Sequence, residues 1–185
     1  GEDTFTVVLD ARLGSDVVIN VSSGDTGEGT VSSSTLTFTP SDWDTPQTVT
    51  VTGVDDDIID GTQTFNITLS IDDNNSDDNF DALGDKTVSV DNTDDDAAGF
   101  TLSKTTASVS EVGTTDDFTV VLTAEPASNV VINITSGDTG EATVDASSIT
   151  FTPANWNTPQ TVTITGEDDS DLDGDQTTTI TLSVD

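Results

Sequence analysis

The chain has 185 residues, of which 36 are Asp or Glu and only 3 are Lys or Arg, so its formal net charge is −33. Three cations cannot neutralise a phosphate backbone or an anionic lipid surface, which argues against binding to nucleic acid and docking on membranes. The absence of His and Cys removes the nucleophile pairs, thiolate metal sites and disulfides that those residues form. No run is apolar for long enough to suggest insertion into a bilayer. The excess of acid therefore needs a counter-charge, for which a divalent cation is the obvious source.

Alternating Val, Ile and Thr residues predict short β-strands along the whole chain, separated by Gly, Asp, Asn and Pro turns. The first half has predicted strands at 4–10, 17–22, 36–39, 48–52, 65–71 and 86–90. The second half has them at 100–103, 107–111, 118–123, 130–135, 149–152, 161–165 and 178–184. No window shows a helical period. Strands of this length and spacing predict an all-β protein made of immunoglobulin-like antiparallel sandwiches, with a closed barrel as the alternative.

The chain contains one unit twice. Residues 4–72 align without a gap on residues 117–185, at a constant offset of 113, and 44 of those 69 positions are identical. We therefore predict two homologous domains, residues 1–97 and 98–185. From the phase of the repeat, we expect the first domain to lack its opening strand and the second its closing strand. Unpaired edges of this kind favour strand exchange or edge pairing with another copy.

Two features have a structural and a functional interpretation. Thr at every second position of 48–52 and 161–165 predicts a solvent-facing side for each strand, although a flat threonine face can also bind ice or a polysaccharide. Trp43 and Trp156 each precede a strand in a W-x-T-P-Q motif. We interpret them as packing anchors, with a sugar-stacking platform as the alternative.

Three clusters of Asp are placed at strand ends or at the boundary between the copies. Adjacent carboxylates about 4 Å apart repel by roughly 4 kcal/mol at an effective dielectric constant of 20, so the clusters need a counter-ion. Ca²⁺ suits them because it takes six to eight hard oxygen ligands in flexible geometry, whereas Zn²⁺ and copper prefer His or Cys. The alternative is a solvated run of charges. The acidic loop 72–81 has no repeat partner, and we expect it to be a mobile, solvated connection. The clusters are Asp55, Asp56, Asp57 and Asp60 in copy one, Asp168, Asp169, Asp171 and Asp173 in copy two, and Asp94, Asp95 and Asp96 at the boundary.

The motifs V-T-V-T-G-V-D-D-D-x-x-D-G and N-T-D-D-D, together with T-F-T-P and S-V-S-E, resemble a Calx-β-type repeat. The form with W-N-T-P-Q-T-V is similar to repeats of very large bacterial surface and RTX-type proteins. The resemblance implies a seven-stranded immunoglobulin-like sandwich with Ca²⁺ at one end. It also implies that the three Asp clusters are ligands, together with Glu111 on the opening strand and, by a looser match, Glu28 and Glu141. Ser170 and Ile58 each replace an acid of the other copy, so each site is expected to hold fewer ions than the family norm.

These observations predict a calcium-rigidified extender repeat of a large adhesin-type protein, secreted or on a bacterial cell surface. Its expected partners are Ca²⁺ and neighbouring repeats, and calcium at the boundary would fix the angle between domains. A carbohydrate-binding β-sandwich is the alternative. We do not expect an enzyme, because the acids gather in metal-like runs and no catalytic set accompanies them.

Overall fold

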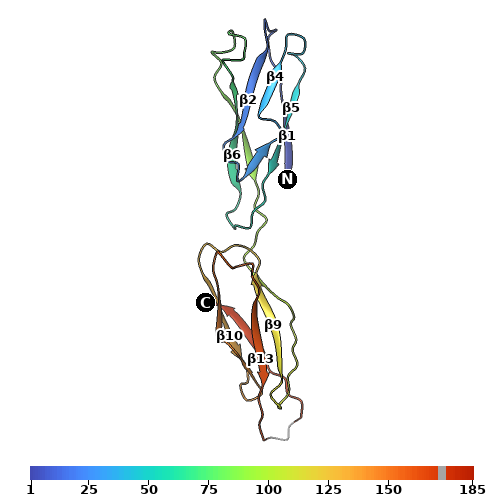
Figure 1. Cartoon of the computed structure of the whole chain (residues 1–185), viewed down its shortest axis with the longest axis vertical. Helices are drawn as coiled ribbons and strands as arrows, with labels where there is room; N and C mark the ends of the chain where they lie inside the picture. Colours follow the sequence, from blue (N-terminus) through green and yellow to red (C-terminus); the bar gives the residue numbers. More distant parts are fainter. Residues whose placement is uncertain (171–173) are drawn as a thin grey trace. The chain divides into compact units, whose positions relative to one another are not determined.

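The computed structural model describes residues 1–170 and 174–185. The chain divides into two compact units, residues 1–56 with 60–94 and residues 57–59 with 95–185 (Figure 1). In the described part of the chain all fourteen elements are β-strands, and all pairings between them are antiparallel, which confirms the prediction of an all-β protein. The described residues form no helix with the length and apolar character of a membrane span.

Unit 1 consists of a three-stranded and a four-stranded sheet. The three-stranded sheet has the order β1 (Glu2–Val7), β5 (Gln47–Gly53) and β3 (Gly29–Val31). The four-stranded sheet has the order β4 (Thr35–Phe38), β2 (Val17–Ser23), β6 (Gln63–Ile71) and β7 (Lys86–Asn92).

Unit 2 has the same two sheets, but the counterpart of the three-stranded sheet of unit 1 here has four strands, and the counterpart of the four-stranded sheet has three. Its four-stranded sheet has the order β11 (Ala142–Val144), β13 (Gln160–Gly166), β9 (Thr115–Leu122) and β8 (Phe100–Leu102). Its three-stranded sheet has the order β12 (Ser148–Phe151), β10 (Val130–Ser136) and β14 (Ile180–Val184).

Strands β1–β6 correspond through the repeat to β9–β14, so each unit has one strand that the other lacks within the described residues. Over residues 1–170 and 174–185, unit 1 has no strand equivalent to β8, and unit 2 has none equivalent to β7. Each unit therefore contains seven strands among the described residues.

The prediction of a strand at 107–111 is wrong, because the structure has no strand there. The amide of Ser108 donates to Asp116 Oδ2 at 3.1 Å, and the amide of Ser110 donates to Thr114 Oγ1 at 2.8 Å. Side-chain acceptors therefore take amides that a strand would offer to a neighbour.

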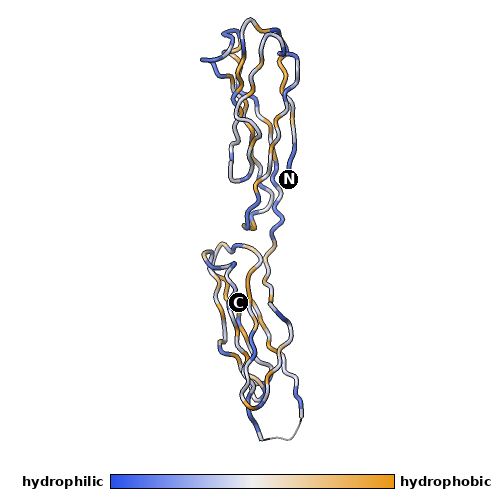
Figure 2. Tube along the Cα trace, turned by 45° about the vertical axis from the view of Figure 1, so that its right-hand side comes forward, coloured by the Kyte–Doolittle hydropathy of each residue, from blue (hydrophilic) through white to orange (hydrophobic). Residues whose placement is uncertain are grey.

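Each core lies between the two sheets of its unit. In β5, Val49 and Val51 are buried while Thr48 is exposed, and β13 repeats this alternation. Figure 2 shows the resulting change between apolar and polar residues along the strands. Trp43 and Trp156 are half-buried and pack against the cores of units 1 and 2, which supports their interpretation as packing anchors.

One core contact differs between the units in a compensating way. A Cβ atom on Gly29 would overlap the ring of Phe65, which is 6% exposed. At the equivalent positions unit 2 has Ala142 and Thr178, so the larger residue on β11 accompanies a smaller one near β14. The absence of a side chain at position 29 therefore makes room for the aromatic ring.

This packing predicts that Gly29→Ala destabilises unit 1 by about 1–3 kcal/mol through overpacking. Phe65→Thr should lower the free energy of unfolding by less in the Gly29→Ala variant than in the parent chain. In the variant it also removes the overlap between the new Cβ atom and the ring of Phe65. Urea unfolding of the two single variants and the double variant measures this coupling. Gly84→Ala is the control, since no atom lies within 4 Å of its Cβ position. Additive losses would contradict the assignment.

Candidate metal centre

Three carboxylates meet at one end of unit 1. Glu28, Asp56 and Asp60 each offer one oxygen, and these oxygens lie within 4.8 Å of one another. Glu28 is half-buried, and the two aspartates are exposed. Ca²⁺ binds oxygens at 2.3–2.6 Å, so two ligands of one ion lie at most about 5 Å apart. The spacing and the all-oxygen donor set therefore fit a hard divalent cation.

Glu28 is positioned by the turn between β2 and β3. Asp25 organises this turn: its Oδ1 accepts from the amide of Gly27 at 2.9 Å, and its backbone oxygen accepts from Gly29 at 3.1 Å. The backbone oxygen of Glu28 then accepts from the amide of Val54 at 2.9 Å, just after β5. The turn is thereby tied to the loop that carries Asp56.

Asn92, at the end of β7, holds the side chain of Glu28. Its Nδ2 donates to Glu28 Oε2 at 3.1 Å and to the backbone oxygen of Val54 at 2.7 Å. A donor on one carboxylate oxygen orients the group and leaves its other oxygen for a ligand. The sequence analysis missed this residue, although the closing N-T-D-D-D motif contains it.

The loop between β5 and β6 supplies Asp56 and Asp60 and is fastened by Asp94. Gly61 has φ of 73°, a conformation that residues with a Cβ rarely adopt. Its amide donates to Asp94 Oδ2 at 2.8 Å, and Gln63 Nε2 donates to the backbone oxygen of Asp60 at 2.9 Å. The half-buried Asp94 therefore fixes the loop beside the cluster.

Other ligands predicted in the first Asp cluster and at the boundary between the two copies lie outside the group of Glu28, Asp56 and Asp60. Asp55 is exposed after β5, and Asp57 is exposed and counted with unit 2. Asp95 is exposed and Asp96 half-buried, and both belong to unit 2. The structure therefore brings Glu28, whose match to the Calx-β-type repeat was the looser one, close to only two of the four Asp in the first cluster, Asp56 and Asp60.

The corresponding end of unit 2 keeps the same backbone frame. The backbone oxygen of Glu141 accepts from the amide of Glu167 at 3.0 Å, and Asp138 repeats both turn bonds of Asp25. Asp168 and Asp169 follow β13 and are exposed. The predicted ligands Asp171 and Asp173 lie outside the described residues. Glu111 is exposed in a turn and, like Glu141, lines a groove of about 930 Å³ in unit 2.

Comparison with protein families decides the chain's identity, because the model of the Calx-beta domain matches residues 1–94 and 93–185. The chain belongs to the Calx-beta family. It therefore carries two Calx-beta domains in tandem, which confirms the resemblance to a Calx-β-type repeat. No curated protein matches the chain.

Two solved structures are similar to the chain. "Crystal structure of CBD12 from CALX1.2" is 16% identical, and the match covers 90% of this chain and 69% of that chain, with a TM-score of 0.36. "Crystal structure of calcium binding domain CBD12 of CALX1.1" is 20% identical, and the match covers 91% of this chain and 70% of that chain, with a TM-score of 0.34.

The first Calx-beta domain has a second acidic region, the loop 72–81. Asp77 in this loop is only 6% exposed, so the prediction of a solvated connection is wrong there. Its Oδ2 accepts from the amides of Gly14 at 2.7 Å and Ser15 at 3.2 Å. Its Oδ1 accepts from the amide and the side chain of Asn79 at 3.1 and 2.6 Å. These donors, first the Asn79 amide and then that of Gly14, lower the pKa of Asp77 from 3.8 to about 2.

Asp81 in the same loop has the opposite environment. Its Oδ1 is buried and has no hydrogen-bond partner among the described residues. Burial raises the pKa of Asp81, and the charges of Asp73, Asp78 and Asp77 raise it further. The loop therefore contains one carboxylate that stabilises the fold as an anion and one that destabilises it.

Asp77→Asn should lower the free energy of unfolding of the first Calx-beta domain at neutral pH. The pKa of Asp77 is lowered on folding, so its contribution is present above about pH 4 and is lost as the pH falls toward about 2. Urea unfolding of parent and variant, repeated between neutral pH and pH 2, should give curves that converge in acid. The exposed Asp10→Asn is the control, and equal stability of Asp77→Asn and parent at neutral pH would contradict the assignment.

Proposed function

We propose that this chain is a calcium-binding structural repeat and that Glu28, Asp56 and Asp60 hold the ion in its first domain. One observation carries the proposal: three carboxylate oxygens lie within 4.8 Å of one another at one end of unit 1. Membership of the Calx-beta family supports it, because Calx-beta domains bind calcium.

The electrostatics of the cluster favour a bound cation. Like charges about 4 Å apart repel by about 1 kcal/mol in bulk water and by more where solvent is partly excluded. Glu28 is half-buried, and Asn92 supplies it with a neutral donor that does not cancel its charge. A divalent cation among the three oxygens converts this repulsion into attraction. Mg²⁺ fits less well, because it demands near-octahedral geometry and retains its water.

We propose a second site in unit 2 from the internal repeat. Glu141 and Asp169 correspond to Glu28 and Asp56, and Asp173, outside the described residues, corresponds to Asp60. The shared hydrogen bonds of Asp25 and Asp138 support this equivalence. Asp168, Asp171 and Glu111 are proposed as further ligands there. Asp55, Asp57, Asp94, Asp95 and Asp96 are proposed as further calcium ligands.

The wider biological role is also a proposal. Tandem repetition, high acidity and the absence of cysteine support an extender module of a large adhesin of the RTX type, secreted or on a bacterial cell surface. Domains 1–97 and 98–185 would be stiffened by calcium and would connect to neighbouring repeats. We do not propose carbohydrate binding, because both tryptophans are half-buried against the cores. We do not propose catalysis either, since the gathered carboxylates are accounted for as metal ligands.

Calcium should raise the melting temperature of the chain. Extracellular modules bind Ca²⁺ with a Kd of about 10⁻⁴–10⁻³ M, and a ligand at 100 times Kd stabilises by about 2.7 kcal/mol. For a domain of this size that corresponds to a rise of about 10 °C or more. Thermal unfolding in chelator and in rising Ca²⁺ measures the shift.

Glu28→Gln and Asp60→Asn should each reduce this calcium-dependent rise in the first domain. Asp44→Asn removes the same charge from an exposed position in the loop before β5 and should leave the rise intact. A series in NaCl at equal ionic strength separates site binding from general screening. The proposal would be wrong if NaCl reproduced the full rise or if Glu28→Gln retained it.

A further inference from the structure

An Asp-Gly pair lies in the loop between β5 and β6 as Asp60-Gly61, and the repeat has another at Asp173-Gly174. Asp173 lies outside the described residues. In an Asp-Gly pair the backbone nitrogen of Gly can attack the side-chain carboxyl group of Asp, because no Cβ atom crowds that nitrogen. Elsewhere in the chain, each Asp that precedes another residue precedes one with a Cβ atom. Asp60 is therefore the described aspartate that is chemically most open to rearrangement.

The loop around this pair gives such a reaction space and water. Asp60, Gly61 and Thr62 are exposed and lie in no strand. No atom lies within 4 Å of the Cβ position of Gly61, and its φ of 73° is a conformation that Gly adopts without strain. The turn thus favours Gly at position 61, and the same residue leaves the backbone nitrogen accessible.

Two hydrogen bonds hold the peptide unit between Asp60 and Gly61 at both of its ends. The N–H of Gly61 donates to Asp94 Oδ2 at 2.8 Å. The carbonyl oxygen of Asp60 accepts from Gln63 Nε2 at 2.9 Å. A ring formed by the Gly61 nitrogen and the Asp60 side chain has no N–H, so the bond to Asp94 is lost when the ring closes. The ring also fixes the rotation of this peptide unit, which the two bonds now set, and both bonds therefore oppose ring closure.

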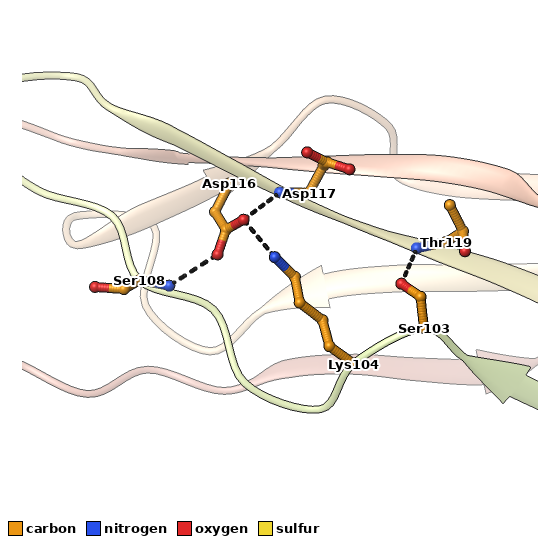
Figure 3. Close-up of polar contacts among 6 residues, drawn as sticks. All are labelled: Ser103, Lys104, Ser108, Asp116, Asp117 and Thr119. Carbon is orange, nitrogen blue, oxygen red and sulfur yellow. Dashed lines mark hydrogen bonds and ion pairs between the residues drawn. The ribbon is translucent and has the colours of Figure 1, made fainter.

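Asp116 on β9 is an aspartate that other features protect (Figure 3). The amide of Asp117 donates to Asp116 Oδ1 at 2.9 Å, so the following nitrogen is already beside the carboxylate. However, Asp117 has a Cβ atom, and both residues are paired with β13. The hydrogen bond from Lys104 also lowers the pKa of Asp116, and an ionised carboxylate resists attack by a nitrogen. Asp116 is therefore a reference residue that should stay unchanged while Asp60 reacts.

We propose that Asp60 is a site of spontaneous isomerisation to isoaspartate, and that the two hydrogen bonds of the Asp60-Gly61 peptide unit restrain it. The Gly61 nitrogen forms a bond to Cγ of the protonated Asp60 carboxyl group. The proton of the nitrogen and the hydroxyl of the carboxyl group leave as water, which gives a five-membered succinimide ring. Water then adds to the former backbone carbonyl carbon of Asp60 and breaks its bond to the nitrogen. The main chain now runs through Cγ, and the water released in the first step is taken up again in the second.

Isomerisation also removes Asp60 from the carboxylate cluster, a consequence that rests on the proposed calcium site. The free carboxylate of isoaspartate is attached directly to Cα, which retracts its oxygens by about one C–C bond, ~1.5 Å. The oxygen that lies within 4.8 Å of those of Glu28 and Asp56 is thereby displaced, by more than Ca²⁺–O bonds of about 2.3–2.6 Å tolerate. A bound ion in turn holds the Asp60 carboxylate and should slow the reaction. Occupancy of the site thus sets how long the site lasts.

The test incubates the whole chain in chelator below its melting temperature. Isoaspartate is measured by peptide mapping with electron-transfer fragmentation, which distinguishes the two forms of equal mass, and it should accumulate at residue 60 but not at Asp116. Asp94→Ala should speed the reaction about 10-fold or more, the equilibrium factor of one hydrogen bond to a charged acceptor, and Gln63→Ala about 3-fold or more. Asp44→Ala, in the exposed loop before β5, should leave the rate unchanged. Near-UV circular dichroism checks that each variant is folded, and Gln63→Ala keeps the test valid if Asp94→Ala is not.

A second incubation in Ca²⁺ separates this inference from the proposed function. Ca²⁺ at about 10 times its Kd should slow the reaction of the parent chain about 10-fold, because only empty sites react, and should have little effect on Glu28→Gln. Isomerisation in chelator without an effect of Ca²⁺ supports the inference and contradicts the calcium site. The inference is overturned if residue 60 remains aspartate in chelator, if Asp116 reacts equally, or if folded Asp94→Ala and Gln63→Ala react at the parent rate. A slower reaction in Asp94→Ala also overturns it, since Asp94 then acts as a base and not as a restraint.

Discussion

Burial of alternate apolar side chains between two sheets is the interaction on which the rest of this structure depends. A chain with a formal charge of −33 and three cations gains little from ion pairs, so its cohesion comes from residues such as Phe38, Val49 and Ile67, which are fully buried. The alternation that buries Val49 and Val51 also exposes the neighbouring Thr48 and fixes the point where β5 ends. Because strand ends are fixed by the core, the acidic loops that follow them are brought together whatever their mutual repulsion.

The candidate metal centre follows from this arrangement. Three segments far apart in sequence reach the same end of unit 1: the turn before β3 with Glu28, the loop after β5 with Asp56 and Asp60, and the end of β7 with Asn92 and Asp94. Neutral donors from the backbone and from Asn92 orient the carboxylates but do not remove their charge. The folding energy of the sandwich thus holds ligands close together before an ion binds, which is the preorganisation that a structural cation site needs.

Patterns within short stretches of sequence predicted most of this fold. Which residues from distant loops meet in space was harder to predict. The alternation and the internal repeat predicted the all-β tandem architecture and most strands. They missed β3 and β11, which at three residues each are too short to show alternation, and they placed a strand at 107–111 where side chains of Asp116 and Thr114 capture the amides. The dense Asp runs pointed to the loop after β5, but the cluster also needs Glu28, whose distance in space from Asp56 depends on how two loops meet. Asp77 appeared to be a surface charge because nothing local in its loop shows that Gly14 and Ser15 donate to it.

The central claim is that the gathered carboxylates of unit 1 are ligands of a calcium ion and not merely a charged surface. A calorimetric Ca²⁺ titration of the whole chain tests this most directly, with Glu28→Gln titrated beside it under the same buffer and salt. The account predicts a saturable binding isotherm with a Kd of about 10⁻⁴–10⁻³ M and the loss of at least one equivalent of Ca²⁺ in the variant. An isotherm without saturation, or the same stoichiometry and affinity in both proteins, would contradict it.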